Sequence, residues 1–478
     1  MIRSHVWRTS ALASLLFVGA LATPREAEAS GYLTARFGAD HGAPAHPNTY
    51  AIYFNPAALG GTRGTTITGD VSVLLRYAQY TRTADALSPS NDSFLADQNY
   101  VDANTGKATL TNLLALPFVG VNTDFGTKNL RGGFAAYVPF GGLATWDRIR
   151  GVPGSPGSTD GAQRWHNISG QILAVYNTFA LAYKFGDSNF SVGASFSPII
   201  HNVATTRARN GDGSDDTVTG NSVVEGRSFV SATGLNFGGS VGVYYEPTSD
   251  LRFGLSYLAQ PGFGETRISG TLRTQLGGGQ ESKADIDFLQ TYPDIIRFGA
   301  AWRVDRRLEL RGDFEFVRWS TFDRQCIVEK GGTCAVAEDG RRLPGDAGNK
   351  VQLNVPRNWN NAIGVRVGPG YWITDQLEGF GSVGLTTPAV PKETIDASTV
   401  DALRLYLTLG AKYEFNKHWA LAGSYNHIYF FNVNTNGAND QNLAAHPEGD
   451  YNVSRSPSAD GRYRSQIGMV NVNVAYTF

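Results

Sequence analysis

Hydrophobic and polar residues alternate with a period of two along most of this chain. Near its end, Val470, Val472 and Val474 would share one face of a strand, and Asn471 and Asn473 the other. Alternation of this kind predicts a β-strand with one apolar and one polar face. It recurs in fourteen segments: 66–83, 107–123, 130–140, 164–184, 189–206, 231–246, 250–260, 293–304, 307–322, 358–373, 376–386, 402–415, 417–433 and 462–478.

The connections between these segments alternate in length. Short ones such as 185–188 and 247–249 take turns with long ones such as 84–106 and 323–357. Short turns at one end, long loops at the other and an even number of strands are typical of a bacterial transmembrane β-barrel. Closure of the sheet also leaves no unpaired strand edge in hydrocarbon. We therefore expect an all-β, antiparallel transmembrane barrel of about fourteen strands over residues 66–478.

The N-terminus predicts export. Arg3 and Arg8 precede an apolar run from Ala11 to Ala22, and small residues follow at Ala27-Glu28-Ala29, which together predict a signal peptide over residues 1–29. About 12 apolar residues are too few to cross a bilayer as a helix. We expect the mature chain in the outer membrane of a Gram-negative cell, with both termini in the periplasm.

Residues 30–65 precede the first predicted strand and do not alternate. A barrel of fourteen strands is wide enough to need a plug. Tyr50, Tyr53 and Phe54 favour packing against other residues, because disordered tails are usually poorer in aromatic side chains. We therefore expect a hatch inside the lumen, and a disordered periplasmic tail is the alternative.

Composition and charge exclude several other classes. Charged residues make up 17% of the chain, against about 25% in soluble domains. Lys and Arg number 41 against 42 Asp and Glu, so that the net charge is −1 and no nucleic-acid partner is expected. Cys326 and Cys334 lie in one long loop and predict a disulfide in an oxidising compartment. The His and Cys spacings predict neither a metal nor another cofactor.

The segment Tyr53–Leu59, with the sequence Tyr-Phe-Asn-Pro-Ala-Ala-Leu, resembles the hatch motif of the FadL/TodX-type outer-membrane transporters of long-chain fatty acids and hydrocarbons. Further segments that resemble this family follow in the expected order: 137–141, 179–184, 234–239, 252–257, 292–294, 319–322, 386–388 and 401–404. The resemblance implies a 14-stranded barrel with an N-terminal hatch, surrounded by outer-membrane lipid and lipopolysaccharide, and we expect a monomer. One departure is loop 207–230, which is polar where family members capture ligand on apolar external loops.

The resemblance also implies an apolar path through the wall at a kink in the third strand. That strand corresponds to 130–140, and it is expected to end at Pro139, followed by Gly141 and Gly142. Proline removes a donor from the strand ladder and glycine weakens pairing. We therefore expect the lateral opening at Pro139, Gly141 and Gly142.

The expected ligand is a hydrophobic small molecule, most simply a long-chain fatty acid. Its expected contacts in the hatch are Tyr53, Phe54, Asn55, Pro56 and Ala57, and the candidate cations in the lumen are Arg297, Arg311, Arg366 and Arg404. An unpaired arginine matches a carboxylate well. The alternative is that these arginines pair with acidic neighbours, as buried charges usually do.

The expected function is gradient-driven uptake of such molecules, without catalysis. Gly238–Gly242 matches the G-x-S-x-G nucleophile pattern, but it falls inside a predicted strand, whereas the chemistry needs a strand-to-helix turn. An aromatic hydrocarbon channel, a general diffusion porin and an outer-membrane lipid hydrolase remain as alternatives.

Overall fold

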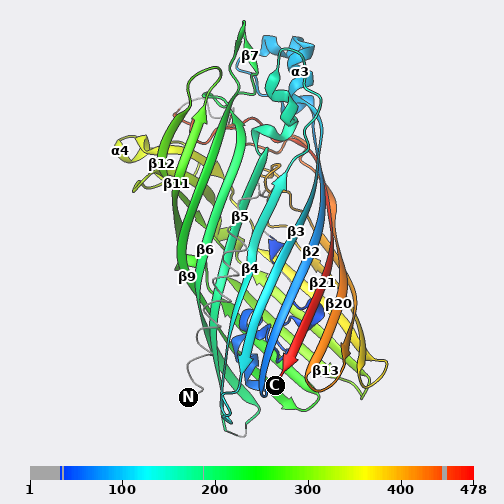
Figure 1. Cartoon of the computed structure of the whole chain (residues 1–478). Coiled ribbons are helices and arrows are strands. Elements are labelled where there is room, and N and C mark those ends of the chain that lie inside the picture. The colour runs from blue at the N-terminus through cyan, green and yellow to red at the C-terminus, as the bar shows by residue number, and fades with distance from the viewer. Residues whose placement is uncertain (1–32, 35–36, 187, 444–448) are drawn as a thin grey trace, which may run out of the picture.

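The computed structural model describes residues 33–34, 37–186, 188–443 and 449–478. Within these residues, fourteen strands close into one antiparallel barrel (Figure 1), which confirms the predicted fold class. They are β2 (Thr65–Arg82), β3 (Gly106–Thr123), β4 (Leu130–Thr145), β5 (Ser169–Lys184), β6 (Phe190–Arg209), β9 (Gly226–Thr248), β10 (Leu251–Leu258), β13 (Ile295–Arg303), β14 (Leu308–Val317), β17 (Ala362–Trp372), β18 (Leu377–Thr386), β19 (Arg404–Glu414), β20 (Trp419–Asn434) and β21 (Gly461–Thr477). Pairing of β21 with β2, from Thr66 opposite Thr477 to Arg82 opposite Gly461, closes the wall. The predicted signal peptide lies outside the described residues.

The barrel is apolar outside and polar inside. Along β2, the outward side chains of Ile67, Val71 and Leu75 are 45%, 38% and 54% exposed, whereas Asp70 and Ser72 point inward and are buried. This is the arrangement that a lipid-facing barrel needs. Among the described residues, no helix is both long enough and apolar enough to cross a bilayer.

Two long loops form β-hairpins that the sequence did not predict. Strands β11 (Glu265–Gln275), β12 (Ser282–Thr291), β15 (Arg324–Glu329) and β16 (Val351–Pro356) pair in this order beside the upper half of β9. We call these four strands the upper sheet, because they extend the wall at the long-loop end (Figure 1). Smaller strands are β1 (Leu33–Thr34), β7 (Val218–Thr219) and β8 (Ser222–Val223).

The helices are short and lie in the hatch and the loops. They are η1 (Ala39–His41), α2 (Ala51–Phe54), η2 (Pro56–Gly61), η3 (Ala84–Ala86), η4 (Asp92–Ala96), α3 (Gln98–Asn104), η5 (Pro156–Asp160), η6 (Ala162–Trp165), η7 (Pro261–Phe263), η8 (Trp319–Thr321) and α4 (Asp346–Asn349). The predicted strand at 307–322 therefore ends early, because η8 turns the chain at residue 319.

Cys326 of β15 is joined to Cys334 by a disulfide within the upper sheet. Replacing Cys334 with serine should loosen β15 and β16, because closing so short a loop contributes about 2–3 kcal/mol. Hydrogen exchange of the β15 and β16 amides should become at least about tenfold faster. Exchange in β2, on the barrel wall, is the internal control. Unchanged exchange in β15 would show that the disulfide does not brace the sheet.

The hatch, here residues 37–64, lies inside the barrel at the end where the C-terminus is found (Figure 1). Its seat is made of glycines on the inner wall. A Cβ at Gly193 would overlap the backbone of Pro56 and Ala57, and one at Gly242 would overlap the side chain of Asn55. Gly242 ends the G-x-S-x-G sequence, which lies within β9 with no helix after it. The glycines therefore make room for the hatch.

Candidate functional site

Polar contacts attach the hatch to the wall. Tyr50 Oη donates to Asp70 Oδ2 of β2 at 2.8 Å. Asn55 Nδ2 donates to the carbonyl oxygens of Pro44 at 3.0 Å and Val243 at 2.9 Å, and its Oδ1 accepts from the Ala57 amide at 3.2 Å. Asn55 therefore joins two hatch segments to β9.

Three of the four candidate arginines take part in the same attachment. Arg297 pairs with Glu315 at 2.7 Å and donates to Tyr53 Oη at 2.7 Å. Arg366 pairs with Asp40 of the hatch at 3.1 Å and with Asp313. Arg311 pairs with Glu309 and Glu378, and Glu378 also contacts His41 of the hatch. These cations already have carboxylate partners, which matches the pairing alternative.

The five candidate hatch residues are packed against the wall. Tyr53, Phe54, Asn55 and Ala57 are each at most 2% exposed, and Pro56 is buried between them. In this conformation they hold the hatch in place. Their contact with a ligand stays a prediction.

The barrel wall has a gap beside β4. Strands β3 and β4 pair only from Phe118 opposite Tyr137 to Thr123 opposite Gly132. From the Phe118–Tyr137 pair toward the long-loop end, the edges of β3 and β4 separate. They meet again where Asn112 Oδ1 accepts from the Thr145 amide at 3.1 Å. The backbone of β1 enters the gap and pairs with β4 at Phe140 and Gly141.

The kink differs from the sequence expectation in one respect. Strand β4 does not end at residue 140 but continues to Thr145. Between Tyr137 and Phe140 its register with β5 shifts by one residue, so that Val138 and Pro139 form a bulge. Gly141 and Gly142 follow the bulge on the edge of the gap. Pro117 of β3 lies where pairing stops, so each edge carries a residue without an N–H.

A column of aromatic rings runs from the hatch past this gap. Its members, with the distances between successive ring centroids, are Tyr53, Tyr137 (5.1 Å), Tyr176 (5.7 Å), Phe140 (6.2 Å), Trp319 (6.5 Å) and Trp359 (4.8 Å). All six are buried. The column provides a continuous apolar surface between the gap and the upper lumen.

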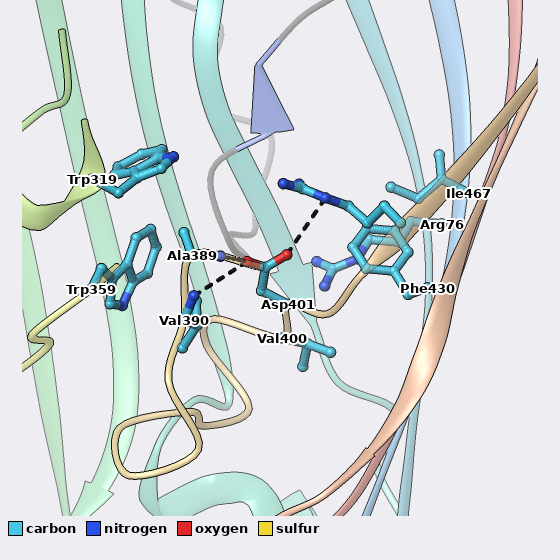
Figure 2. Close-up of a pocket in the computed structure, with 10 residues that line it drawn as sticks. Arg76, Trp319, Trp359, Ala389, Val390, Val400, Asp401, Phe430 and Ile467 are labelled. Carbon is cyan, nitrogen blue, oxygen red and sulfur yellow. Dashed lines mark hydrogen bonds and ion pairs between the residues drawn. The ribbon is translucent and has the colours of Figure 1, made fainter. Parts of the chain in front are cut away.

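The column ends at a small cavity of about 20 Å³ that we call the inner chamber (Figure 2). It is lined by Arg76, Trp319, Trp359, Ala389, Val390, Val400, Asp401, Arg404, Phe430 and Ile467. Asp401 accepts from the amides of Ala389 and Val390, and its other oxygen lies 3.6 Å from Arg404 Nε. Arg404 is therefore the one candidate arginine that reaches this chamber.

Arg76 was not among the candidates. It is 9% exposed, and among the described residues it has neither a hydrogen bond nor an ion pair, with Nη1 fully buried. The lining of the inner chamber thus contains two arginines and one aspartate, which leaves one positive charge uncompensated. Alternation along β2 places Arg76 on the same face as Asp70 and Ser72, so its inward direction could have been found from sequence.

Buried ion pairs tie the loops together at the long-loop end. Arg82 pairs with Asp215 at 2.7 Å, and Arg164 pairs with Glu225 at 2.9 Å, all with side chains at most 2% exposed. Burial alone would raise the pKa of Glu225, but Arg164 and Arg227 outweigh it and hold that pKa below its usual range. The loops that carry these residues are therefore fixed in position.

Comparisons with known proteins extend these observations. A model of the family described as outer membrane protein transport protein (OMPP1/FadL/TodX) matches residues 13–478. No curated protein matches the sequence.

Several solved structures share the fold at low sequence identity. A Pseudomonas aeruginosa FadL homologue is 16% identical, with a TM-score of 0.73 over 94% of this chain and 100% of that one. The P. putida toluene transporter TodX is 13% identical, with a TM-score of 0.61 over 94% and 99%. The Ralstonia pickettii toluene transporter TbuX is 15% identical, with a TM-score of 0.59 over 94% and 99%. At these identities the likeness shows the fold alone.

Proposed function

The chain belongs to the OMPP1/FadL/TodX family of outer-membrane transport proteins, and we propose that its substrate is a single-chain amphiphile with an anionic head, such as a long-chain fatty acid. The family is one of transporters for hydrophobic molecules, which favours transport over the lipid-hydrolase alternative. The anionic head group of the substrate is inferred from residues of this chain and not from the family.

Arg76 carries the proposal. A buried charge without a partner is costly, and among the described residues nothing neutralises Arg76. A carboxylate in the inner chamber would accept from its guanidinium, and the alkyl chain would lie against Trp319, Trp359 and the rest of the aromatic column. An uncharged arene would leave the arginine unpaired.

We further propose the direction of transport. The long-loop end faces the outside and both termini face the periplasm, in keeping with the loop lengths of outer-membrane barrels. The ligand then leaves sideways along Phe140 and through the gap between β3 and β4, which requires β1 to leave its pairing with Phe140 and Gly141. This route avoids passing an apolar chain through water. Movement follows the concentration gradient.

Replacing Arg76 with glutamine should weaken oleate binding about 10- to 100-fold, because a charge-assisted hydrogen bond is lost. Equilibrium dialysis with radiolabelled oleate and protein in lipid nanodiscs measures this. Binding of oleyl alcohol, which has the same chain without the charge, should not change. Arg464→Gln is the matched control, because Arg464 is exposed on the neighbouring strand β21. Equal oleate affinity in Arg76→Gln and the native protein would exclude carboxylate binding at Arg76.

Two alternatives make different predictions in the same system. Structurally similar proteins are described as toluene transporters, and an aromatic hydrocarbon channel would transport toluene equally well with Arg76 or with glutamine at that position. A general diffusion porin would conduct small ions in large steps across a planar bilayer. A barrel filled by the hatch should show almost no ion conductance.

A further inference from the structure

Three neighbouring strands of the wall, β5, β6 and β9, place polar side chains together on the lumen face (Figure 1). Tyr176 of β5 lies opposite Ile199 of β6, and Ile199 lies opposite Asn236 of β9. His201 follows Ile199 by two residues along β6, so it shares the same face. Directly opposite side chains on adjacent strands stand about 5 Å apart at Cβ. We call Tyr176, His201 and Asn236 the polar patch.

Each member of the polar patch has a buried polar atom that lacks a hydrogen-bond partner among the residues that the structure describes. These atoms are Tyr176 Oη, His201 Nε2 and Asn236 Nδ2. Tyr176 and His201 are both 0% exposed. A buried donor or acceptor without a partner is costly, and such groups are rare in folded proteins. Three of them on one stretch of wall indicate a binding site for a polar atom, and an ordered water is the alternative to a ligand.

The polar patch can both donate and accept hydrogen bonds. Asn236 Nδ2 donates, and the hydroxyl of Tyr176 does either. Nδ1 of His201 lies 3.2 Å from Tyr292 Oη, and Nε2 of the neutral ring takes the role that Nδ1 does not have there. A hydroxyl group also donates and accepts, whereas a carboxylate only accepts. The patch contains neither arginine nor lysine, so it matches a neutral hydroxyl better than an anionic head group.

The polar patch lies beside the aromatic column and away from the inner chamber. The ring of Phe140 is 6.2 Å from that of Tyr176 and 5.7 Å from that of Tyr292, which stands 5.1 Å from the ring of His201. The side chains that line the inner chamber come from other positions. An alkyl chain that starts at Arg76 and follows the column past Phe140 therefore brings a point along its length, and not its head group, to the patch.

We propose that the polar patch binds a hydroxyl group on the alkyl chain of the amphiphile, so that the protein prefers hydroxylated long-chain carboxylates. This rests on the proposed function, because the carboxylate at Arg76 sets where the chain runs. A hydroxyl group in an apolar lumen is costly unless it is hydrogen-bonded. In the patch it would meet three polar atoms that are already buried without partners, whereas a plain alkyl chain would leave all three unsatisfied.

A series of hydroxystearates that differ only in the position of one hydroxyl group tests this proposal against stearate. Equilibrium dialysis with protein in lipid nanodiscs gives the ratio of the two affinities for each isomer. In the native protein, at least one isomer should bind about tenfold more tightly than stearate. Tyr176→Phe should abolish this preference. Tyr176→Phe combined with Asn236→Leu should reverse it, because the hydroxyl group is then buried without a partner.

Tyr137→Phe is the matched control, because Tyr137 is the neighbouring ring of the column and its hydroxyl group already bonds to that of Thr178 at 2.8 Å. It should keep the native ratio. Tyr176→Phe breaks no hydrogen bond with a described residue, so the variant should fold, and unchanged heat-modifiable mobility on a gel checks this.

Two results would overturn the proposal. Equal affinity of the native protein for stearate and every isomer would assign the polar patch to ordered water. An undiminished preference in Tyr176→Phe would place the hydroxyl group elsewhere. The proposed function fails separately, if Arg76→Gln leaves the affinity for stearate unchanged, and the ratio for each isomer can still be measured in that case.

Discussion

Replacing Gly193 with valine should open the barrel to small solutes. The new Cβ would overlap the backbone of Pro56 and Ala57, which cannot rotate away as a flexible side chain would. Any shift of η2 also strains the contacts of Asn55, whose loss leaves the buried carbonyls of Pro44 and Val243 without a donor at about 1–3 kcal/mol each. About 3 kcal/mol corresponds to a more than 100-fold rise in the population with an unseated hatch. Planar bilayers should then record large conductance steps that the native protein lacks.

Gly69→Val is the matched control for this prediction. Gly69 lies on the outward face of β2, and a Cβ there has no atom within 4 Å. Its conductance should equal that of the native protein. A folded Gly193→Val barrel without these conductance steps would show that the hatch tolerates displacement at this seat.

Sealing the wall gap should abolish uptake while the barrel still folds. Deleting Pro139 removes the extra residue of the bulge, so that Phe140 would stand opposite Leu116 if the register of Phe118 and Tyr137 continued. Replacing Pro117 with valine supplies the missing N–H on β3. Both Leu116 and Phe140 pack in the interior cluster, so the sealed wall keeps the correct inside and outside. Oleate uptake by cells that depend on this protein should fall to the level of cells without it.

Pro117→Val alone is the control for the sealed variant. It keeps the bulge at Val138 and Pro139, so the gap and uptake should persist. Heat-modifiable gel mobility confirms that both variants are folded. Native uptake by the sealed, folded variant would show that the ligand leaves by another route, since β3 and β4 would then be paired throughout.

The strands of the barrel wall were predicted from the sequence far better than the contacts inside the lumen. Alternation is a local property, so the fourteen strands could be located to within a few residues, with the largest differences at the ends of β4 and β14 and at the starts of β5 and β9. The upper sheet was missed as a whole. Its hairpins β11–β12 and β15–β16 are local but lie in segments that were interpreted as loops, and their assembly beside β9 depends on distant pairing that leaves little local signal. The hatch was predicted as a segment, but its glycine seat depends on contacts between distant residues.

For the charged residues too, the sequence predicts the direction of a side chain but not its contacts. Alternation gives the direction of Arg76, Arg297 and Arg366, all of which point inward. Whether each has a partner depends on side chains from other strands and from the hatch, such as Glu315 for Arg297 and Asp40 for Arg366. The ion-pair partners of these arginines could therefore be identified only from the three-dimensional structure. The unpaired arginine was found on a strand where the sequence offered no reason to prefer it.

The glycine seat also bears on the order of assembly. Gly193, Gly242, Gly254 and Gly299 belong to β6, β9, β10 and β13, and hatch atoms lie within 3.0 Å of where each Cβ would be. No seat exists until these strands from the middle of the chain stand side by side. The hatch, although it is translated early, can therefore dock only after these four strands, which are translated later, have paired.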